Sequence, residues 1–162
     1  MRTIIHDLED TSFLNLRSDD VLISDVDNSC IGCFTCWVKT PFSCIYKDRI
    51  INNGMQILNS DELIIISKCI NGCYSSKVKR ILERSISYVE PFFTLRNKEI
   101  HHLERNPKKI DFKIYFYNKN ITDKDKIISK HLVTANKKNL NTLCPNLYFY
   151  NSYKEINLWY YT

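Results

Sequence analysis

Short runs of β-branched and aromatic residues alternate with helix-like segments along this chain. The runs are residues 3–6, 20–24, 62–67, 111–117 and 146–150. Each has the composition and length of a buried strand. Strands that alternate with helices need crossover connections, so the pattern predicts an α/β fold with a five-stranded, mainly parallel sheet. A length of 162 residues suits a single domain, residues 1–162.

Two of the intervening segments show clear helical periodicity. In residues 75–90 apolar side chains recur on one helical face, and Pro91 supplies a stop. The second helix is predicted to start at Thr122, with Asp125 placed as in a capping box, and to run through Ala135. The apolar positions of the first segment are Val78, Ile81, Leu82, Ile86 and Val89.

Composition bounds the class of protein. The first ten residues carry acids and no long apolar stretch, which predicts neither a signal peptide nor a membrane anchor. We therefore expect a soluble cytoplasmic protein with no membrane partner, in which the seven cysteines stay reduced. The formal charge is +5, but Lys and Arg are scattered, which favours a solvated surface over nucleic-acid binding.

Four cysteines stand close together as C-x2-C-x2-C-x7-C, at Cys30, Cys33, Cys36 and Cys44. Reduced thiols at this spacing indicate a metal centre or redox chemistry. Overlapping C-x2-C steps suit a [4Fe–4S] cluster, whereas structural zinc usually takes two separated C-x2-C knuckles. A third hypothesis is a metal-free loop packed by small thiols, in which Cys33 or Cys36 is redox-active. The spacing favours iron–sulfur over zinc and leaves metal-free thiols open.

A three-layer α/β sandwich places its binding loops at the carboxyl ends of the strands. The four-cysteine loop follows the second strand, and the turn `SKCINGCYSSKVKR` follows the third. In this turn Asn71 and Gly72 can adopt backbone conformations closed to most residues, and a following serine can cap the next helix. The turn also holds Cys69 and Cys73. We therefore expect six of the seven cysteines at one rim of the sheet.

At this point the motifs resemble a known family. Residues 67–84, `SKCINGCYSSKVKRILER`, resemble the segment S-P-x-Y-x-G-x-x-S-x-x-x-K-x-x-x-D-R of flavodoxin-like NAD(P)H-dependent FMN reductases. The run `CIGCFTCWVKTPFSCIYKD` is similar to the C-x-G-C-x-x-C...C-x-x-x-D segment that carries the cluster ligands in iron–sulfur flavoproteins. The matching positions are Ser67, Gly72, Ser75, Lys79 and Arg84 in the first segment, and Cys30, Gly32, Cys33, Cys36, Cys44 and Asp48 in the second.

The resemblance implies a flavodoxin-like three-layer sandwich with sheet order 2-1-3-4-5. It implies an FMN-dependent oxidoreductase of the NAD(P)H-dependent flavin or quinone reductase type, which passes electrons from NAD(P)H to a small acceptor. The cofactor would carry the chemistry, so no catalytic side chain is assigned. Homodimers are common in this family, and a homodimer is expected. The implied FMN-binding residues are Ser67, Asn71, Gly72 and Ser75, and the implied ligands of a [4Fe–4S] cluster are Cys30, Cys33, Cys36 and Cys44.

The segment after the first strand departs from the family pattern. Family members carry a glycine- and hydroxyl-rich loop there, which cradles the FMN phosphate as helix N-termini hold anions. Here `HDLEDTSFLNL` contains no glycine and brings Asp7, Glu9 and Asp10, which repel a phosphate, beside Thr11 and Ser12. The alternative hypothesis is therefore a flavodoxin-like domain that has lost FMN binding and acts as a binding or thiol/metal module.

We expect structural roles for the histidines and for the last cysteine. His6 ends the first strand and is interpreted as a hydrogen-bonded structural residue, and His101 and His102 as an exposed pair in a loop. Cys144 is predicted to be a buried thiol at the opposite end of the sheet. The aromatic segment 146–161 is either a dimer surface or a last strand with a short helix laid on the core.

Overall fold

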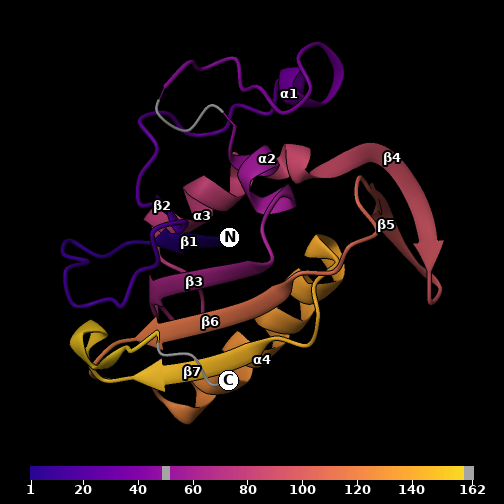
Figure 1. The fold of residues 1–162 in the computed structure, drawn as a ribbon. Coiled ribbons are helices and arrows are strands. Elements are labelled where there is room, and N and C mark those ends of the chain that lie inside the picture. The colour runs from indigo at the N-terminus through magenta and orange to yellow at the C-terminus, as the bar shows by residue number, and fades with distance from the viewer. Residues whose placement is uncertain (49–51, 159–162) are drawn as a thin grey trace.

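A computed structural model of the chain describes residues 1–48 and 52–158 and contains a five-stranded parallel sheet (Figure 1). The order across the sheet is β2-β1-β3-β6-β7, with every neighbouring pair parallel. The α/β class and the five predicted strands are confirmed, each to within one residue at either end. The bounds are β1 Arg2–His6, β2 Val21–Ile23, β3 Glu62–Lys68, β6 Asp111–Tyr117 and β7 Asn146–Tyr150.

The predicted sheet order 2-1-3-4-5 is corrected to 2-1-3-6-7, because the chain forms two further strands between β3 and β6. Strands β4 (Val89–Arg96) and β5 (Glu99–Glu104) pair with each other as a separate antiparallel hairpin. Asn97 and Lys98 join them with positive φ angles of 50° and 68°, as a tight two-residue hairpin turn requires. His101 and His102 therefore lie on a strand and not in the predicted loop.

Local sequence signals identify the two longest helices, with one exception in their bounds. The helix bounds are α1 Thr35–Val38, α2 Asn53–Leu58, α3 Ser76–Glu83 and α4 Asp123–Leu140, with single 3-10 turns η1 Ile86–Tyr88 and η2 Tyr153–Glu155. The predicted capping box at Thr122 and Asp125 is present at the start of α4. No helix among the described residues is long and apolar enough to cross a membrane.

The exception is α3, which ends at Glu83 and not at Pro91 as predicted. Helix α2 lies against η1, where a longer α3 would continue. The approach is so close that a Cβ atom on Gly54 would lie 2.3 Å from Ser87 Oγ. Pro91 lies inside β4 instead of stopping a helix.

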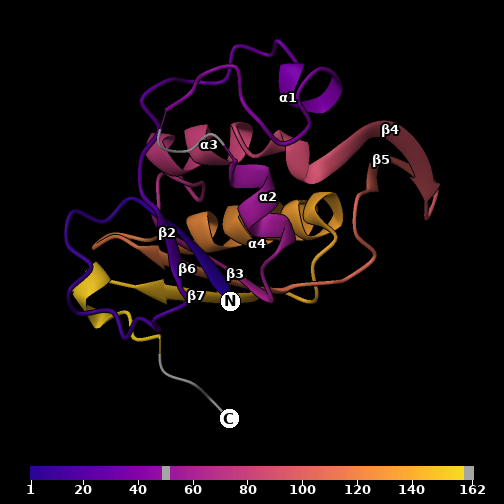
Figure 2. The same cartoon turned by 45° about the horizontal axis from the view of Figure 1, so that its top comes forward.

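The two faces of the sheet are covered differently (Figure 2). Helices α2, α3 and α4 pack on one face, over the larger apolar core. The other face is covered by residues 7–20 and by the segment after β7, which supply Leu8, Leu14, Ile156 and Leu158. Residues 7–20 form no helix in the described chain. The third layer of the predicted three-layer sandwich is thus a layer of irregular chain.

A buried ion pair fastens this irregular layer to the sheet. Arg2, on β1, donates from Nε to Asp20 Oδ1 over 2.8 Å and from Nη2 to Asp20 Oδ2 over 2.5 Å. Both side chains are buried. Burial alone would raise the pKa of Asp20, but hydrogen bonds from Arg2 and from the Arg17 backbone N–H outweigh it and lower that pKa. An ion pair therefore fixes the connection from β1 to β2 on this face of the sheet, where other α/β folds have a packed helix.

The turn after β3 is fixed by its own backbone and by α4. Ile70 and Cys73 exchange two backbone hydrogen bonds of 2.9 Å around Asn71 and Gly72, which have φ angles of 50° and 77°. The Gly72 carbonyl accepts a hydrogen bond from the Ser129 hydroxyl on α4. A Cβ atom on Gly72 would lie 2.6 Å from Ile128 Cβ and 2.7 Å from the Asp125 carbonyl oxygen.

We predict that Gly72→Ala lowers the free energy of unfolding by about 3 kcal/mol, because it adds overpacking to the strain of a left-handed backbone. Gly32→Ala is the matched control. Gly32 also has a positive φ, of 66°, but its added Cβ would meet nothing within 4 Å. Strain alone should cost about 1 kcal/mol there. Urea unfolding of both variants measures the difference, and equal losses would contradict the packing of the turn on α4.

Candidate functional site

The four clustered cysteines line one pocket. The loop between β2 and α2 folds over a cavity of about 390 Å³ with a mostly apolar wall. Sequence spacing alone placed these thiols together, and the structure brings all four to the same cavity. The lining residues are Cys30, Ile31, Gly32, Cys33, Phe34, Cys36, Cys44, Ile45, Tyr46, Glu83, Arg84 and Ile86. We call this cavity the thiol pocket.

The thiol pocket lies at the carboxyl end of α3 and not at the predicted rim of the sheet. Glu83, Arg84 and Ile86 contribute the part of its wall that comes from α3 and η1. Figure 1 shows the loop and α1 beyond α2 and α3, on the side of these helices that faces away from the sheet. The strand β2 delivers the chain to the sheet edge, but the loop then runs back over the helical layer.

A buried ion pair between Arg84 and Asp48 closes the loop that forms the pocket. Arg84 Nη2 donates to Asp48 Oδ1 over 2.9 Å, and its Nη1 contacts Asp48 Oδ2. The same guanidinium donates to the Asn28 carbonyl over 3.2 Å and to the Tyr46 carbonyl over 3.5 Å. Arg84 thus holds both the beginning and the end of the loop. Hydrogen bonding to Asp48 raises the pKa of Arg84, against burial, and Cys44 adds to the rise.

One donor of Arg84 remains for a bound group. The side chain of Arg84 is fully buried, and its Nε has no hydrogen-bond partner among the described residues. A buried N–H group without a partner is costly, so a group in the pocket that accepts this hydrogen bond would be stabilised. Thiolate and sulfide sulfurs are acceptors of this kind. In the sequence, Arg84 and Asp48 are recognisable only as motif positions, and no local pattern predicts their pairing.

Aromatic side chains fasten α1 to the base of the hairpin. The Trp37 indole N–H is shared between the carbonyl oxygens of Ile86 and Val89, at 3.0 and 2.9 Å. The Trp37 ring stacks on Phe34, with centroids 5.2 Å apart, and contacts the His102 ring at 5.0 Å. Phe34 belongs to the pocket wall, and Trp37 packs against the main core. Trp37 therefore has a packing role, and Phe34 stays half exposed.

The thiols of Cys33 and Cys36 differ in acidity. Hydrogen bonds from the Thr35 hydroxyl and the Thr35 backbone N–H lower the pKa of the exposed Cys33 thiol. Burial raises the pKa of Cys36, and the nearby Cys44 and Cys30 raise it further. The expectation that one member of this C-x-x-C pair has a lowered pKa agrees with this direction, and Cys33 is that member.

The turn predicted to bind a flavin ring lies at the other end of α3. Ser67 Oγ accepts a 2.9 Å hydrogen bond from the Ser75 backbone N–H, and the Ser75 hydroxyl caps α3 by accepting from Val78 N–H. Asn71 is exposed. Eight residues of helix, about 12 Å, separate this turn from the thiol pocket. Cys69 and Cys73 stay with the turn, so the six cysteines do not gather at one rim.

The carboxyl edge of the sheet does not fit a phosphate group. The Asp7 carboxylate, directly after β1, accepts hydrogen bonds of 2.9 Å from the Lys68 backbone N–H and from the Tyr117 hydroxyl. The Ser12 hydroxyl donates to Asp10 over 2.9 Å. Residues 7–20 form no helix, so β1 is not followed by a helix N-terminus that could bind an anion at this edge. The structure places an anion where the family pattern places the anion-binding loop.

The remaining predicted residues have mixed outcomes. His6 is buried, its Nδ1 accepts from the Leu8 N–H at 3.3 Å, and burial lowers its pKa, which confirms the structural role. Cys144 is exposed and not buried as predicted, because it precedes β7 in a surface turn, with Lys137 Nζ 3.2 Å from its sulfur. In the C-terminal segment η2 packs on the core, while Trp159, Tyr160 and Tyr161 lie outside the described residues.

Comparisons with family models, curated proteins and solved structures give no match for this chain. Within residues 1–48 and 52–158, no three His, Cys, Asp or Glu side chains converge as they would around a single metal ion. The donor set of the thiol pocket nevertheless fits a sulfur-ligated centre, because four thiols and an unpartnered guanidinium N–H surround one cavity.

We predict that alkylation of the metal-free protein modifies Cys33 at lower pH than Cys36, because the thiolate is the reactive form. Thr35→Val should move the Cys33 midpoint to higher pH, since it removes the hydroxyl that stabilises the thiolate. Thr35→Ser should restore it. Thr40→Val is the control, because that hydroxyl donates to the Ser43 carbonyl. Mass spectrometry of each cysteine across pH gives the midpoints, and a Cys33 midpoint unmoved in Thr35→Val would refute the assignment.

Proposed function

We propose that this chain is a flavodoxin-like module whose functional part is the thiol pocket, and that Cys30, Cys33, Cys36 and Cys44 hold a [4Fe–4S] cluster. The observation that carries the proposal is the convergence of all four thiols on one apolar cavity beside Arg84. Four thiolates make a strongly anionic set, and the buried guanidinium lies where it offsets that charge. Of the two hypotheses from the sequence, this is the thiol/metal module.

The geometry favours a cluster over a single zinc ion. Zinc needs four ligand atoms within about 2.3 Å of one point, and the overlapping C-x2-C steps are not the usual zinc spacing. A cluster instead takes each thiolate on a different iron, so its ligands spread around a larger body. This suits four thiols that line a single cavity of about 390 Å³.

The surrounding residues have clear tasks beside such a centre. When bound, a [4Fe–4S] cluster supplies one-electron transfer. Arg84 would donate from Nε to a sulfur atom, which stabilises negative charge and favours the reduced form. Phe34 and Ile45 would limit access of water from the open side of the cavity. Cys33, with its lowered pKa, would be the first thiol to bind metal as a thiolate.

We predict that the protein, reconstituted with iron and sulfide without oxygen, turns brown and holds about four irons and four sulfides per chain. Cys36→Ser should lose most of this content. Cys73→Ser is the matched control and should keep it, because Cys73 lies at the other end of α3. Iron and sulfide assays with visible absorption measure the result. Uptake of one zinc per chain and no iron would show a zinc site instead, and unchanged iron in Cys36→Ser would refute the ligand set.

A second candidate function is the FMN-dependent oxidoreductase implied by the family resemblance, with NAD(P)H as donor. One observation favours it. Asn71 and Ile70 are exposed on the turn after β3, with the left-handed backbone at Asn71 and Gly72 that can present N–H groups to a flat ring. Against it stand Asp7 and the missing helix after β1. We derive no flavin chemistry for this chain because the phosphate end does not fit.

Titration with FMN and with riboflavin separates the two candidates. We predict a Kd for FMN weaker than about 100 μM, because Asp7 and Asp10 repel the phosphate at the only edge where the family pattern places it. Flavin fluorescence reports binding. Tight binding of FMN would restore the oxidoreductase as the function. Equal tight binding of riboflavin would locate that affinity in the ring-binding turn alone.

A further inference from the structure

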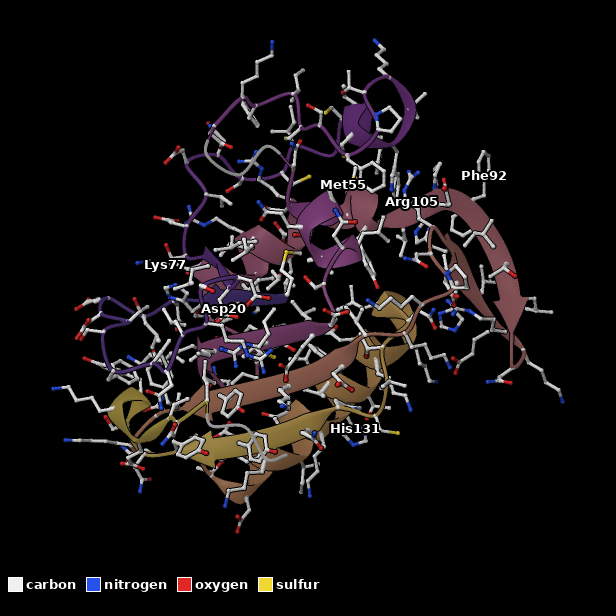
Figure 3. All side chains as sticks on the ribbon, in the orientation of Figure 1. Asp20, Met55, Lys77, Phe92, Arg105 and His131 are labelled. Carbon is white, nitrogen blue, oxygen red and sulfur yellow. The ribbon has the colours of Figure 1, made fainter. Side chains whose placement is uncertain are left out.

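The β4–β5 hairpin projects from the body of the molecule as an arm with an apolar outer face. Figures 1 and 2 show it extending away from the sheet and the helices. Register pairs Phe93 with His102 and Leu95 with Ile100, so these four side chains share one face of the ribbon. Phe92 points away from the body near the base of the arm (Figure 3). The exposed fractions are 66% for Phe92, 69% for Phe93, 70% for Leu95 and 75% for Ile100.

The polar face of the arm is turned toward α4, while His102 at the base of the apolar face contacts Trp37. Glu99 on the polar face forms a 2.8 Å ion pair with Lys138 of α4, and Arg96 donates to the Lys138 carbonyl at 3.5 Å. Arg96 also pairs with Glu104. In a half-buried ribbon the apolar face usually packs on the core, whereas here the polar face packs on α4. A two-stranded ribbon is at best marginally stable alone, and in this one Phe93, Leu95 and Ile100 stay largely exposed.

We infer that this face is the docking surface for a second copy of the same chain, related by a two-fold axis. Phe93, Leu95 and Ile100 on this face, with Phe92 near the base of the arm, offer about 500 Å² of apolar surface per chain. A symmetric pair would bury about 1,000 Å² through these residues, which is the size a specific interface needs. A patch of this size on one chain lies in the upper range for a monomer.

Charge favours a like partner. Phe93, Leu95 and Ile100 carry no formal charge, and the ionic groups of Arg96 and Glu99 are paired with Glu104 and Lys138. Two copies with a net charge of +5 each can therefore meet here without facing like charges. A nucleic acid or an acidic protein would find no cation on this face. A two-fold contact needs only that the surface be complementary to itself, which a flat uncharged apolar ribbon satisfies.

An apolar recess beside the arm enlarges the surface. It has a volume of about 380 Å³ and is lined by Leu82, Ile86, Tyr88, Val89 and Leu140, among others. His102 lines the recess and also belongs to the apolar face of the arm. Each copy thus carries both projecting apolar side chains and a recess beside them. In a two-fold dimer the side chains of each copy can enter the recess of the other. The inference does not depend on the proposed metal centre.

Charged substitution of Leu95 tests this directly. The wild-type protein should have twice the 19.2 kDa chain mass by light scattering during gel filtration. Leu95→Glu and Leu95→Lys should each weaken dimerisation at least about 100-fold, because like charges meet at the two-fold axis. An equimolar mixture of the two variants should regain the dimer. This rescue requires that the partner be another copy of the chain.

Two controls keep the outcome clear. Ile127→Glu adds the same charge on α4 at a side chain of 57% exposure and should leave the dimer intact. The neutral double change Phe93→Ser with Ile100→Ser should also give a monomer, and circular dichroism checks that every variant is folded. A wild-type monomer at about 100 μM, folded Leu95 variants that still dimerise, or a mixture that stays monomeric would each overturn the inference.

Discussion

The guanidinium of Arg84 is the contact on which the candidate site depends. It pairs with Asp48 and reaches the carbonyl oxygens of Asn28 and Tyr46, so one side chain at the end of α3 binds both ends of the thiol-bearing loop. Removing one partner of a buried ion pair typically costs about 3–5 kcal/mol, because the other charge is left buried and unpaired. The shape of the pocket therefore rests on the helix and not on the sheet edge that gives the loop its start.

The second constraint is the uneven cover of the sheet. All the helices that pack on it in the described chain lie on one face, and the other is covered by residues 7–20 and by the segment after β7. This replacement has a chemical effect. A helix after β1 would direct its N-terminus at the carboxyl edge, whereas the irregular segment places Asp7 there, bonded to Lys68 N–H and Tyr117. The absence of a helix after β1 and the acidic character of this edge are thus two aspects of one arrangement.

Local signals in the sequence were sufficient for most of the architecture. The strands were found because a run such as residues 62–67 is apolar throughout, as a strand buried on both faces must be. The Thr122 capping box was found because both partners lie three residues apart. The four thiols were found by spacing alone. In each case the signal lies within a short stretch of sequence.

What could not be predicted depends on distant contacts. Helix α3 ends early because Gly54 on α2 approaches Ser87, and nothing near Glu83 encodes that approach. The sequence predicts a loop at His101 and His102 instead of a hairpin. The polar side chains of Arg96, Glu99 and His101 hide the apolar–polar alternation of a strand. The hairpin turn of Asn97 and Lys98 lacks the glycine that usually marks such turns. The pairing of Arg84 with Asp48 spans 36 residues, which no local pattern can reveal.

The attachment of the thiol-bearing loop also determines which changes of sequence the fold can tolerate. Between Asn28 and Asp48 two sets of hydrogen bonds hold the loop to the rest of the fold. Arg84 donates to the loop, and the Trp37 indole donates to the carbonyl oxygens of Ile86 and Val89. Insertions, deletions or altered cysteine spacing between those anchors would leave the strands and their register untouched. The loop can therefore vary in length and cysteine spacing while the strands of the sheet keep their register.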